Sequence, residues 1–248
     1  GVPVFIGHDA KNIGDCDLII FSAAIKSDNV ERAEAKRRGI PELERSEALG
    51  QLTEGYESVV GIAGCHGKTT ITSMLALICE QGGPDATVHI GGFVDFLNGG
   101  VRLGAHDMFI TEACEYVESF LTLRPTIALI NNIDNDHLDY YGDMEHIVAA
   151  FKKFAALLPE NGLLIGNTDD FRVRALMAEH TGRKLSYGMK DADYTPANIT
   201  YDDNGCPGFD IMFRGEKLMH IQLRIPGEHS VMNAIAAAAV AYGTREVI

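Results

Sequence analysis

Continuous apolar runs alternate along this chain with segments in which apolar residues recur every three or four positions. The runs have the length and continuity of strands that are buried on both faces of a parallel sheet. They lie at 18–22, 58–63, 108–111, 126–130 and 162–166. Two weaker strands are predicted at 2–6 and 40–43.

The intervening segments predict helices. The one at 68–79 places four apolar side chains on one face, and these are Ile71, Met74, Leu75 and Ile78. The other helices are predicted at 29–38, 46–52, 144–158, 171–180 and 230–242. From 184 to 223 the pattern changes to short alternating segments with turn signals, which is typical of antiparallel hairpins. This order predicts an α/β fold whose mainly parallel sheet is flanked by helices and carries a small antiparallel appendage.

The first fifty residues contain too few predicted elements for a complete domain. We therefore expect residues 1–52 to be the C-terminal part of one domain and residues 53–248 to form a second domain. The chain begins without Met on a strand-like segment and ends within a helix-like one, so we expect a fragment of a longer protein.

The composition narrows the possible functions. The chain has 248 residues and a net charge of −14, from 35 acidic and 21 basic residues. Such a surface repels phosphate backbones, which argues against nucleic acid as a partner. The apolar runs stay below the roughly 18 residues of a membrane span, and the chain lacks a signal-peptide pattern, so no membrane association is expected. Five cysteines without a CxxC pair argue against a zinc site or a disulfide framework, which favours a cytoplasmic location.

The segment between the predicted strand at 58–63 and the helix that follows it has the features of a phosphate-binding loop. Gly64 and Gly67 allow the backbone to turn its amides toward a phosphate, and the helix N-terminus adds a favourable dipole. Lys68 supplies charge for the β- and γ-phosphates, and the Thr69 hydroxyl can bind Mg²⁺. The strict GxxxxGK[ST] spacing is not met, and the alternative is a glycine-rich turn with a chance Lys-Thr pair.

Two further candidate groups follow predicted strands. Glu112 follows the strand at 108–111, and His137 ends the polar segment after the strand at 126–130. Ligands of open α/β sheets bind at the carboxyl ends of strands, so both groups are expected on the same edge as the phosphate loop. Glu112 and Thr69 would together offer oxygen ligands to Mg²⁺. Taken singly, Glu112 could be a solvated carboxylate and His137 a structural histidine.

These segments resemble the Mur ligase family of bacterial cell-wall precursor synthesis, and most closely its alanine-adding branch. The blocks that carry the resemblance are 64–70, 112–116, 132–139 and 227–234. Weaker similarity upstream, at 6–8 and 22–26, matches the end of the family's first, UDP-binding domain. The chain departs from the family pattern at Cys65, where threonine is usual, and at Ser230, where asparagine is usual.

The resemblance implies a partial Rossmann-like N-terminal domain, a central P-loop domain that binds ATP and Mg²⁺, and a third domain beyond residue 248. It implies that Lys68, Glu112 and His137 are catalytic, that Thr69 and Glu112 bind a first metal ion, and that His137 binds a second. The nucleotide-binding residues that it implies are Gly64, His66, Gly67, Lys68, Thr69, Thr70, His229 and Asn233. His8 and Ser22 would face the uridine end of the substrate, or they are ordinary loop residues.

The implied activity joins L-alanine to the lactyl carboxylate of UDP-N-acetylmuramate through an acyl phosphate, with ADP and phosphate as products. Without a third domain, these 248 residues alone are expected to be inactive. Three alternatives stay open: the family branch that recycles a tripeptide, another P-loop enzyme such as a small-molecule kinase, and a catalytically silent nucleotide-binding paralogue. Glu112 in place of the usual Walker-B aspartate argues against the kinase. The sequence does not predict the oligomeric state.

Overall fold

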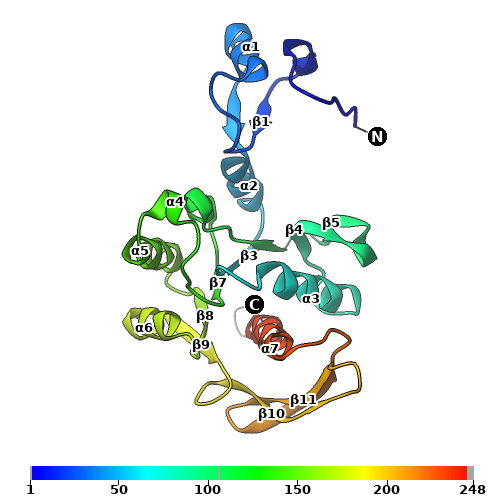
Figure 1. The fold of residues 1–248 in the computed structure, drawn as a ribbon, viewed down its shortest axis with the longest axis vertical. Helices are drawn as coiled ribbons and strands as arrows, with labels where there is room; N and C mark the ends of the chain where they lie inside the picture. The colour runs from blue at the N-terminus through cyan, green and yellow to red at the C-terminus, as the bar shows by residue number, and fades with distance from the viewer. Residues whose placement is uncertain (1, 106, 245–248) are drawn as a thin grey trace. The chain divides into compact units, whose positions relative to one another are not determined.

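The computed structural model describes residues 2–105 and 107–244 (Figure 1). Contacts within the chain divide it into two compact units, Gly1–Leu52 and Thr53–Ile248. None of the helices in the described ranges is long and apolar enough to cross a membrane.

The first unit is built around two short parallel strands, β1 and β2, with Ile19 paired to Glu42. Its elements are the 3₁₀ helix η1 (Ala10–Ile13), β1 (Ile19–Phe21), α1 (Val30–Arg38), β2 (Glu42–Glu44) and α2 (Arg45–Thr53), whose last residue belongs to the second unit. The strand predicted at 2–6 is wrong. This segment runs exposed, and it pairs with no strand among the described residues, so its apolar pattern does not produce a ladder.

The second unit contains one ten-stranded sheet, in the order β12-β11-β10-β9-β8-β7-β3-β6-β4-β5. Its strands are β3 (Ser58–Ala63), β4 (Thr87–Val94), β5 (Gly99–Arg102), β6 (Met108–Glu112), β7 (Ile127–Ile130), β8 (Leu163–Asn167), β9 (Arg183–Tyr187), β10 (Tyr194–Tyr201), β11 (Pro207–Phe213) and β12 (Glu216–Gln222). Its helices are α3 (Lys68–Glu80), α4 (Leu138–Tyr141), α5 (Met144–Ala155), α6 (Phe171–Glu179) and α7 (Glu228–Gly243), with 3₁₀ helices η2 (Asp95–Leu97) and η3 (Tyr116–Thr122).

β3 lies at the centre of the parallel part of this sheet, between β6 and β7. All six of its residues are buried, which explains its continuous apolar sequence. α3 and α7 pack together on one face of the sheet, while α5 and α6 cover the other (Figure 1). Gly61 lies under α5, because a Cβ there would come within 2.9 Å of the Phe154 ring. The predicted α/β class with a mainly parallel, helix-flanked sheet is therefore confirmed.

The antiparallel part differs in detail from the prediction. β11 pairs antiparallel with both β10 and β12, as the hairpin pattern predicts. β9, at the start of the same segment, instead pairs in parallel with β8, so the antiparallel strands continue the main sheet. A second antiparallel hairpin, β4–β5, lies at the other edge of the sheet and was not predicted. Gly91 and Gly92 interrupt the apolar pattern of β4, which hides it from sequence analysis.

Candidate functional site

The predicted phosphate loop connects the buried end of β3 to the first turn of α3. Gly64 has a φ of 138° and Gly67 a φ of 87°, and residues other than glycine rarely adopt such values. The two glycines let the chain reverse into α3 with Lys68 as its first residue. The first backbone N–H groups of a helix have no intrahelical acceptor, so this end of α3 presents donors to an anion.

Two asparagines and a tyrosine outside the loop fix its shape. Asn131 and Asn132 each donate a side-chain hydrogen bond to the carbonyl of His66, at 2.9 and 3.0 Å. The His66 N–H in turn donates to Asn132 Oδ1 at 2.8 Å. The buried Tyr187 hydroxyl donates to Asn131 Oδ1 at 2.6 Å, which fixes the orientation of that amide. Contacts within the protein therefore hold the loop in one conformation, as a preorganised binding site requires.

Cys65, where the resemblance leads one to expect threonine, takes part in the same attachment. Its thiol donates to the carbonyl of Asp134 at 3.4 Å and accepts from the Asp134 N–H at 3.2 Å. Burial raises the pKa of the Cys65 thiol to about 11, so it is a neutral thiol at physiological pH. The Cys65 side chain therefore helps to attach the loop to the segment that follows β7.

Thr69 and Glu112 lie together, as the sequence predicts. The Thr69 hydroxyl donates to Glu112 Oε2 at 3.2 Å. Gly91, on the neighbouring strand β4, donates its N–H to Glu112 Oε1 at 2.8 Å. A Cβ at Gly91 would come within 3.2 Å of Glu112 Oε2, so the glycine keeps the carboxylate accessible. These oxygen donors fit a hard divalent cation beside the phosphate loop.

Lys68 belongs to a second group of side chains. Its ammonium donates to Glu115 at 2.8 and 3.1 Å, one bond to each carboxylate oxygen, and to the carbonyl of Gly64 at 2.5 Å. Glu115 is only 1% exposed, so this is a largely buried ion pair. His137 Nε2 lies 3.8 Å from the same carboxylate. Glu115, Asp136 and His137 each have one potential ligand atom that lies within 4.8 Å of the other two. Such a group of atoms could hold a metal ion.

His137 reaches this group through an unusual backbone conformation. It precedes α4 with a φ of 55°, which is uncommon outside glycine, and its N–H donates to Asp136 Oδ1 at 2.8 Å. Its ring lies against Tyr116, with 4.8 Å between the ring centroids. Strained backbone is concentrated at functional sites in other proteins, and here it directs the imidazole toward Glu115.

Of the two residues expected to contact the nucleoside, Asn233 is buried and His229 is exposed. Asn233 extends from the first turns of α7 to the phosphate loop, where a Cβ at Gly67 would lie 2.8 Å from its Oδ1. His229 folds back over Gly227. Ser230, at the position where the family has asparagine, donates to the carbonyl of Pro226 at 2.9 Å. The N-terminal ends of α3 and α7 therefore meet at the loop.

The other predicted residues are placed as follows. His66 has an exposed ring 3.9 Å from Asp134, and Thr70 is half-buried in the first turn of α3. In the first unit, His8 and Ser22 line one cavity of about 700 Å³. His8 Nδ1 lies 2.9 Å from Glu31, with which it forms a hydrogen bond.

Sequence reasoning assigned no role to Gly91, Glu115, Asp136 and Asn131. Glu115 and Asp136 lie in blocks that carry the resemblance. Each is an acidic residue near a predicted metal ligand, Glu112 or His137, and this proximity could have indicated their place in the site. The role of Gly91 depends on the pairing of β4 beside β6, which no local pattern indicates.

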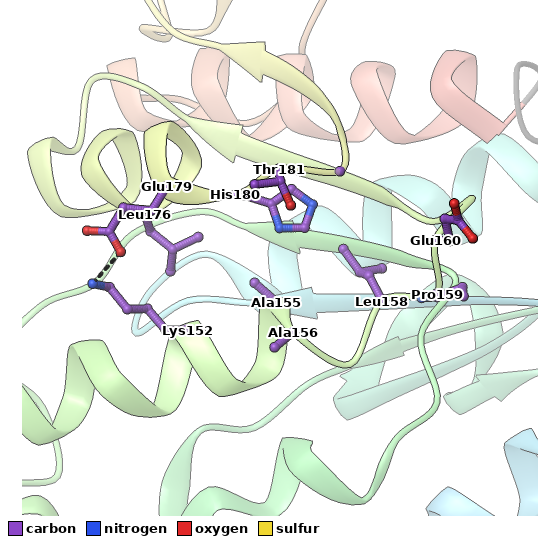
Figure 2. A pocket seen from close by; sticks show the side chains of 11 residues that line it. Lys152, Ala155, Ala156, Leu158, Pro159, Glu160, Leu176, Glu179, His180 and Thr181 are labelled. Atoms are coloured by element: carbon purple, nitrogen blue, oxygen red, sulfur yellow. Dashed lines mark ion pairs between the residues drawn. The ribbon is translucent and has the colours of Figure 1, made fainter.

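A different hollow, of about 610 Å³, lies where α5 and α6 end (Figure 2). The strands β7, β8 and β9 run parallel to β3. This hollow therefore lies at the amino ends of the parallel strands, while the phosphate loop lies at their carboxyl ends. A 2.6 Å ion pair between Lys152 and Glu179 crosses one end, and the His180 ring occupies the middle (Figure 2). None of the predicted site residues lines it.

His180, which lines this hollow, makes the stability of the protein depend on pH. Burial, together with the nearby Lys184 ammonium, lowers the pKa of the imidazole from its usual 6.5. Among the described residues, its buried Nε2 has no hydrogen-bond partner. The unfolded chain therefore binds a proton more readily than the folded one, and stability falls as the pH drops below about 6.5.

We expect the thermal midpoint of the protein to fall less between about pH 7.5 and about pH 5.5 in His180→Leu than in the unmodified chain. The control is His146→Gln. His146 lies at the start of α5, exposed and 2.8 Å from Asp143, so this variant removes a surface imidazole and leaves the buried one in place. Equal slopes for His180→Leu and the unmodified chain would contradict the assignment.

Comparisons with known proteins agree with this geometry. A family model described as the Mur ligase middle domain matches residues 62–241. A second model, described as the Mur ligase family, catalytic domain, matches residues 1–57.

Several relatives are similar over almost the whole chain. A UDP-N-acetylmuramate–L-alanine ligase from Alkaliphilus metalliredigens is 45% identical over 98% of this chain and 53% of its own length. One from Acetivibrio thermocellus is 43% identical over 98% of this chain and 52% of its own length. A crystal structure of a UDP-N-acetylmuramate–alanine ligase from Thermotoga maritima aligns with a TM-score of 0.83 at 26% identity, over 98% of this chain and 55% of that one. The chain spans about half the length of the curated relatives that it matches.

Proposed function

Because the chain belongs to the Mur ligase family, we propose that it supplies the ATP-binding part of a ligase that joins L-alanine to UDP-N-acetylmuramate. The observation that carries the proposal is the loop at the carboxyl ends of the strands, which presents Lys68 at the start of α3 and places the Thr69 hydroxyl against the Glu112 carboxylate. The relatives that are 42–45% identical over nearly the whole chain carry the name of this activity, which supports L-alanine as the amino acid.

In the proposed reaction the lactyl carboxylate of the sugar nucleotide attacks the γ-phosphate of ATP and becomes an acyl phosphate. The amine of L-alanine then displaces phosphate. Two anions must approach each other in the first step, so the site must offset their charge. The Lys68 ammonium and the N–H groups at the start of α3 do this for the phosphates. Asn233 holds the start of α7 against the loop, and we assign His229 and Asn233 to the nucleoside.

The side chains fit a requirement for Mg²⁺. Thr69 and Glu112 offer oxygen donors that are already oriented, the latter by the Gly91 N–H. His137 would contribute to a second ion. Bound Mg²⁺ would neutralise negative charge that develops on the transferred phosphate.

The first unit is assigned to the sugar nucleotide. His8 and Ser22 line the same cavity, which supports the proposal that they face the uridine end. We propose a cytoplasmic location, where ATP and the sugar nucleotide are available.

The test is ATP-dependent phosphate release by the full-length protein with Mg²⁺, UDP-N-acetylmuramate and single amino acids. The proposal requires release that depends on both the sugar nucleotide and L-alanine. Release with a tripeptide but not with L-alanine would assign the protein to the recycling branch. Nucleotide binding without release for any acceptor would indicate a silent paralogue.

A further inference from the structure

The phosphate-loop lysine is fully engaged inside the protein. Lys68 donates to both carboxylate oxygens of Glu115 and to the Gly64 carbonyl, so its three ammonium hydrogens already have acceptors. An ammonium held in this way must break the contact with Glu115 before it can bind a nucleotide phosphate.

Moving Lys68 away would leave the Glu115 carboxylate without a positive partner. Its side chain is 1% exposed, and a buried carboxylate without a positive partner is strongly unfavourable. A triphosphate at the loop would bring further negative charge toward it. If Lys68 moves to the phosphates, another cation must therefore replace its ammonium beside Glu115.

Asp136 and His137 provide the means for such a replacement. Their ligand atoms and that of Glu115 lie within 4.8 Å of one another, and together they offer two carboxylates and an imidazole. This donor set fits a divalent cation. Lys68 lies on one side of this group, with its ammonium 2.8 Å from Glu115 Oε2.

The backbone around Glu115 is held, so Lys68 is the part that can move. Val117 and Glu118 both have a φ of 54°, and this conformation is a rare outlier for a β-branched residue. Three contacts maintain it: the Tyr141 hydroxyl donates to the Glu115 carbonyl, the Phe120 N–H donates to the Cys114 carbonyl at 2.9 Å, and Lys153 pairs with Glu118 at 2.7 Å. The Glu115 carboxylate therefore stays in place and can bind either the Lys68 ammonium or a divalent cation.

We propose that Glu115 is a positioning residue that pairs with Lys68 and exchanges it for a divalent cation when a nucleoside triphosphate binds. The proposal rests on the proposed function, because it needs a nucleotide at the loop. It makes nucleotide and metal binding mutually reinforcing, since each favours the arrangement in which Lys68 has left Glu115. Without metal, the nucleotide must draw Lys68 away from a carboxylate that then stays unpaired.

The experiment uses the full-length protein and the imido analogue of ATP, which resists hydrolysis. Calorimetry gives its affinity in EDTA and in Mg²⁺, and electron paramagnetic resonance counts bound Mn²⁺ in the presence of the analogue. In Glu115→Gln the metal-free affinity should rise about fivefold or more, because Lys68 is released from an ionised partner. The factor by which Mg²⁺ raises the affinity for the analogue should decrease about tenfold, and the variant should bind one Mn²⁺ fewer than the unmodified protein.

Two further variants separate charge from structure. Glu115→Asp keeps the charge, so the metal-free affinity should stay as weak as in the unmodified protein. Glu179→Gln removes a carboxylate from an ion pair at the opposite edge of the sheet and should change neither affinity. An unchanged metal-free affinity in Glu115→Gln would overturn the proposal, and so would equal losses with and without metal. Failure of the unmodified protein to bind the analogue at all would instead contradict the proposed function.

Discussion

Replacing Lys68 with alanine is expected to lower ATP-dependent phosphate release by the full-length protein on the order of 10³-fold. The substitution removes the positive charge at the first position of α3, where the terminal phosphates of ATP are proposed to bind. The loop backbone and the start of α3 remain, so nucleotide binding should weaken less than turnover. Steady-state phosphate release, with nucleotide affinity measured separately, gives both quantities.

Loss of activity alone would not establish this role, because Lys68 also neutralises the buried Glu115. Lys68→Ala leaves that carboxylate without a partner, which should lower the free energy of unfolding by about 3 kcal/mol. The double variant Lys68→Ala/Glu115→Gln removes both charges and should recover much of this stability while staying inactive. Recovery of activity in the double variant would contradict a direct action of Lys68 on phosphate.

A matched surface variant completes the comparison. Lys190→Ala also removes a lysine charge from this acidic protein, but at an exposed position outside the predicted site. It should keep both activity and stability within measurement error. A similar loss in Lys190→Ala would mean that net charge, and not the position of Lys68, determines the rate.

The sequence predicts the parts of this fold whose physics is local. β3, β6, β7 and β8 are continuous apolar runs because both their faces are covered, and α3 follows from its apolar spacing. The phosphate loop is equally local, since its glycines, Lys68 and Thr69 are consecutive. The run at 2–6 is also apolar, though weaker as a strand pattern, and it forms no strand, because a strand also needs a neighbour to pair with.

The partners of these residues could not be predicted in the same way. Glu115 pairs with Lys68 from 47 positions away, and the strained turn at Val117 lies two residues after Glu115. Asn131 and Tyr187 hold the loop from two different strand ends. Such contacts depend on strand order, which side-chain periodicity does not encode. Local patterns therefore identified the loop but not the residues that shape it.

Gly67→Ala is expected to abolish high-affinity nucleotide binding. Gly67 has a φ of 87°, and a Cβ there would lie 2.6 Å from Asn131 Nδ2 and 2.8 Å from Asn233 Oδ1. Both neighbours are buried, so they cannot move aside without disturbing the loop and α7. A displacement of about 1 Å at such a site lowers function about 10²-fold, and we expect at least this loss of affinity for ADP in Mg²⁺ by calorimetry.

Two effects of this substitution can be separated with a glycine of the same conformation. Gly215 also has a φ of 87°, but a Cβ there would have no atom within 4 Å. Gly215→Ala should therefore lower the free energy of unfolding by about 1 kcal/mol from backbone strain alone. Gly67→Ala adds the steric conflict and should lower it by about 3 kcal/mol. If denaturant titrations gave equal losses for the two variants and ADP affinity were unchanged in both, Asn131 and Asn233 would not constrain the loop. The preorganised phosphate site inferred from these contacts would then be wrong.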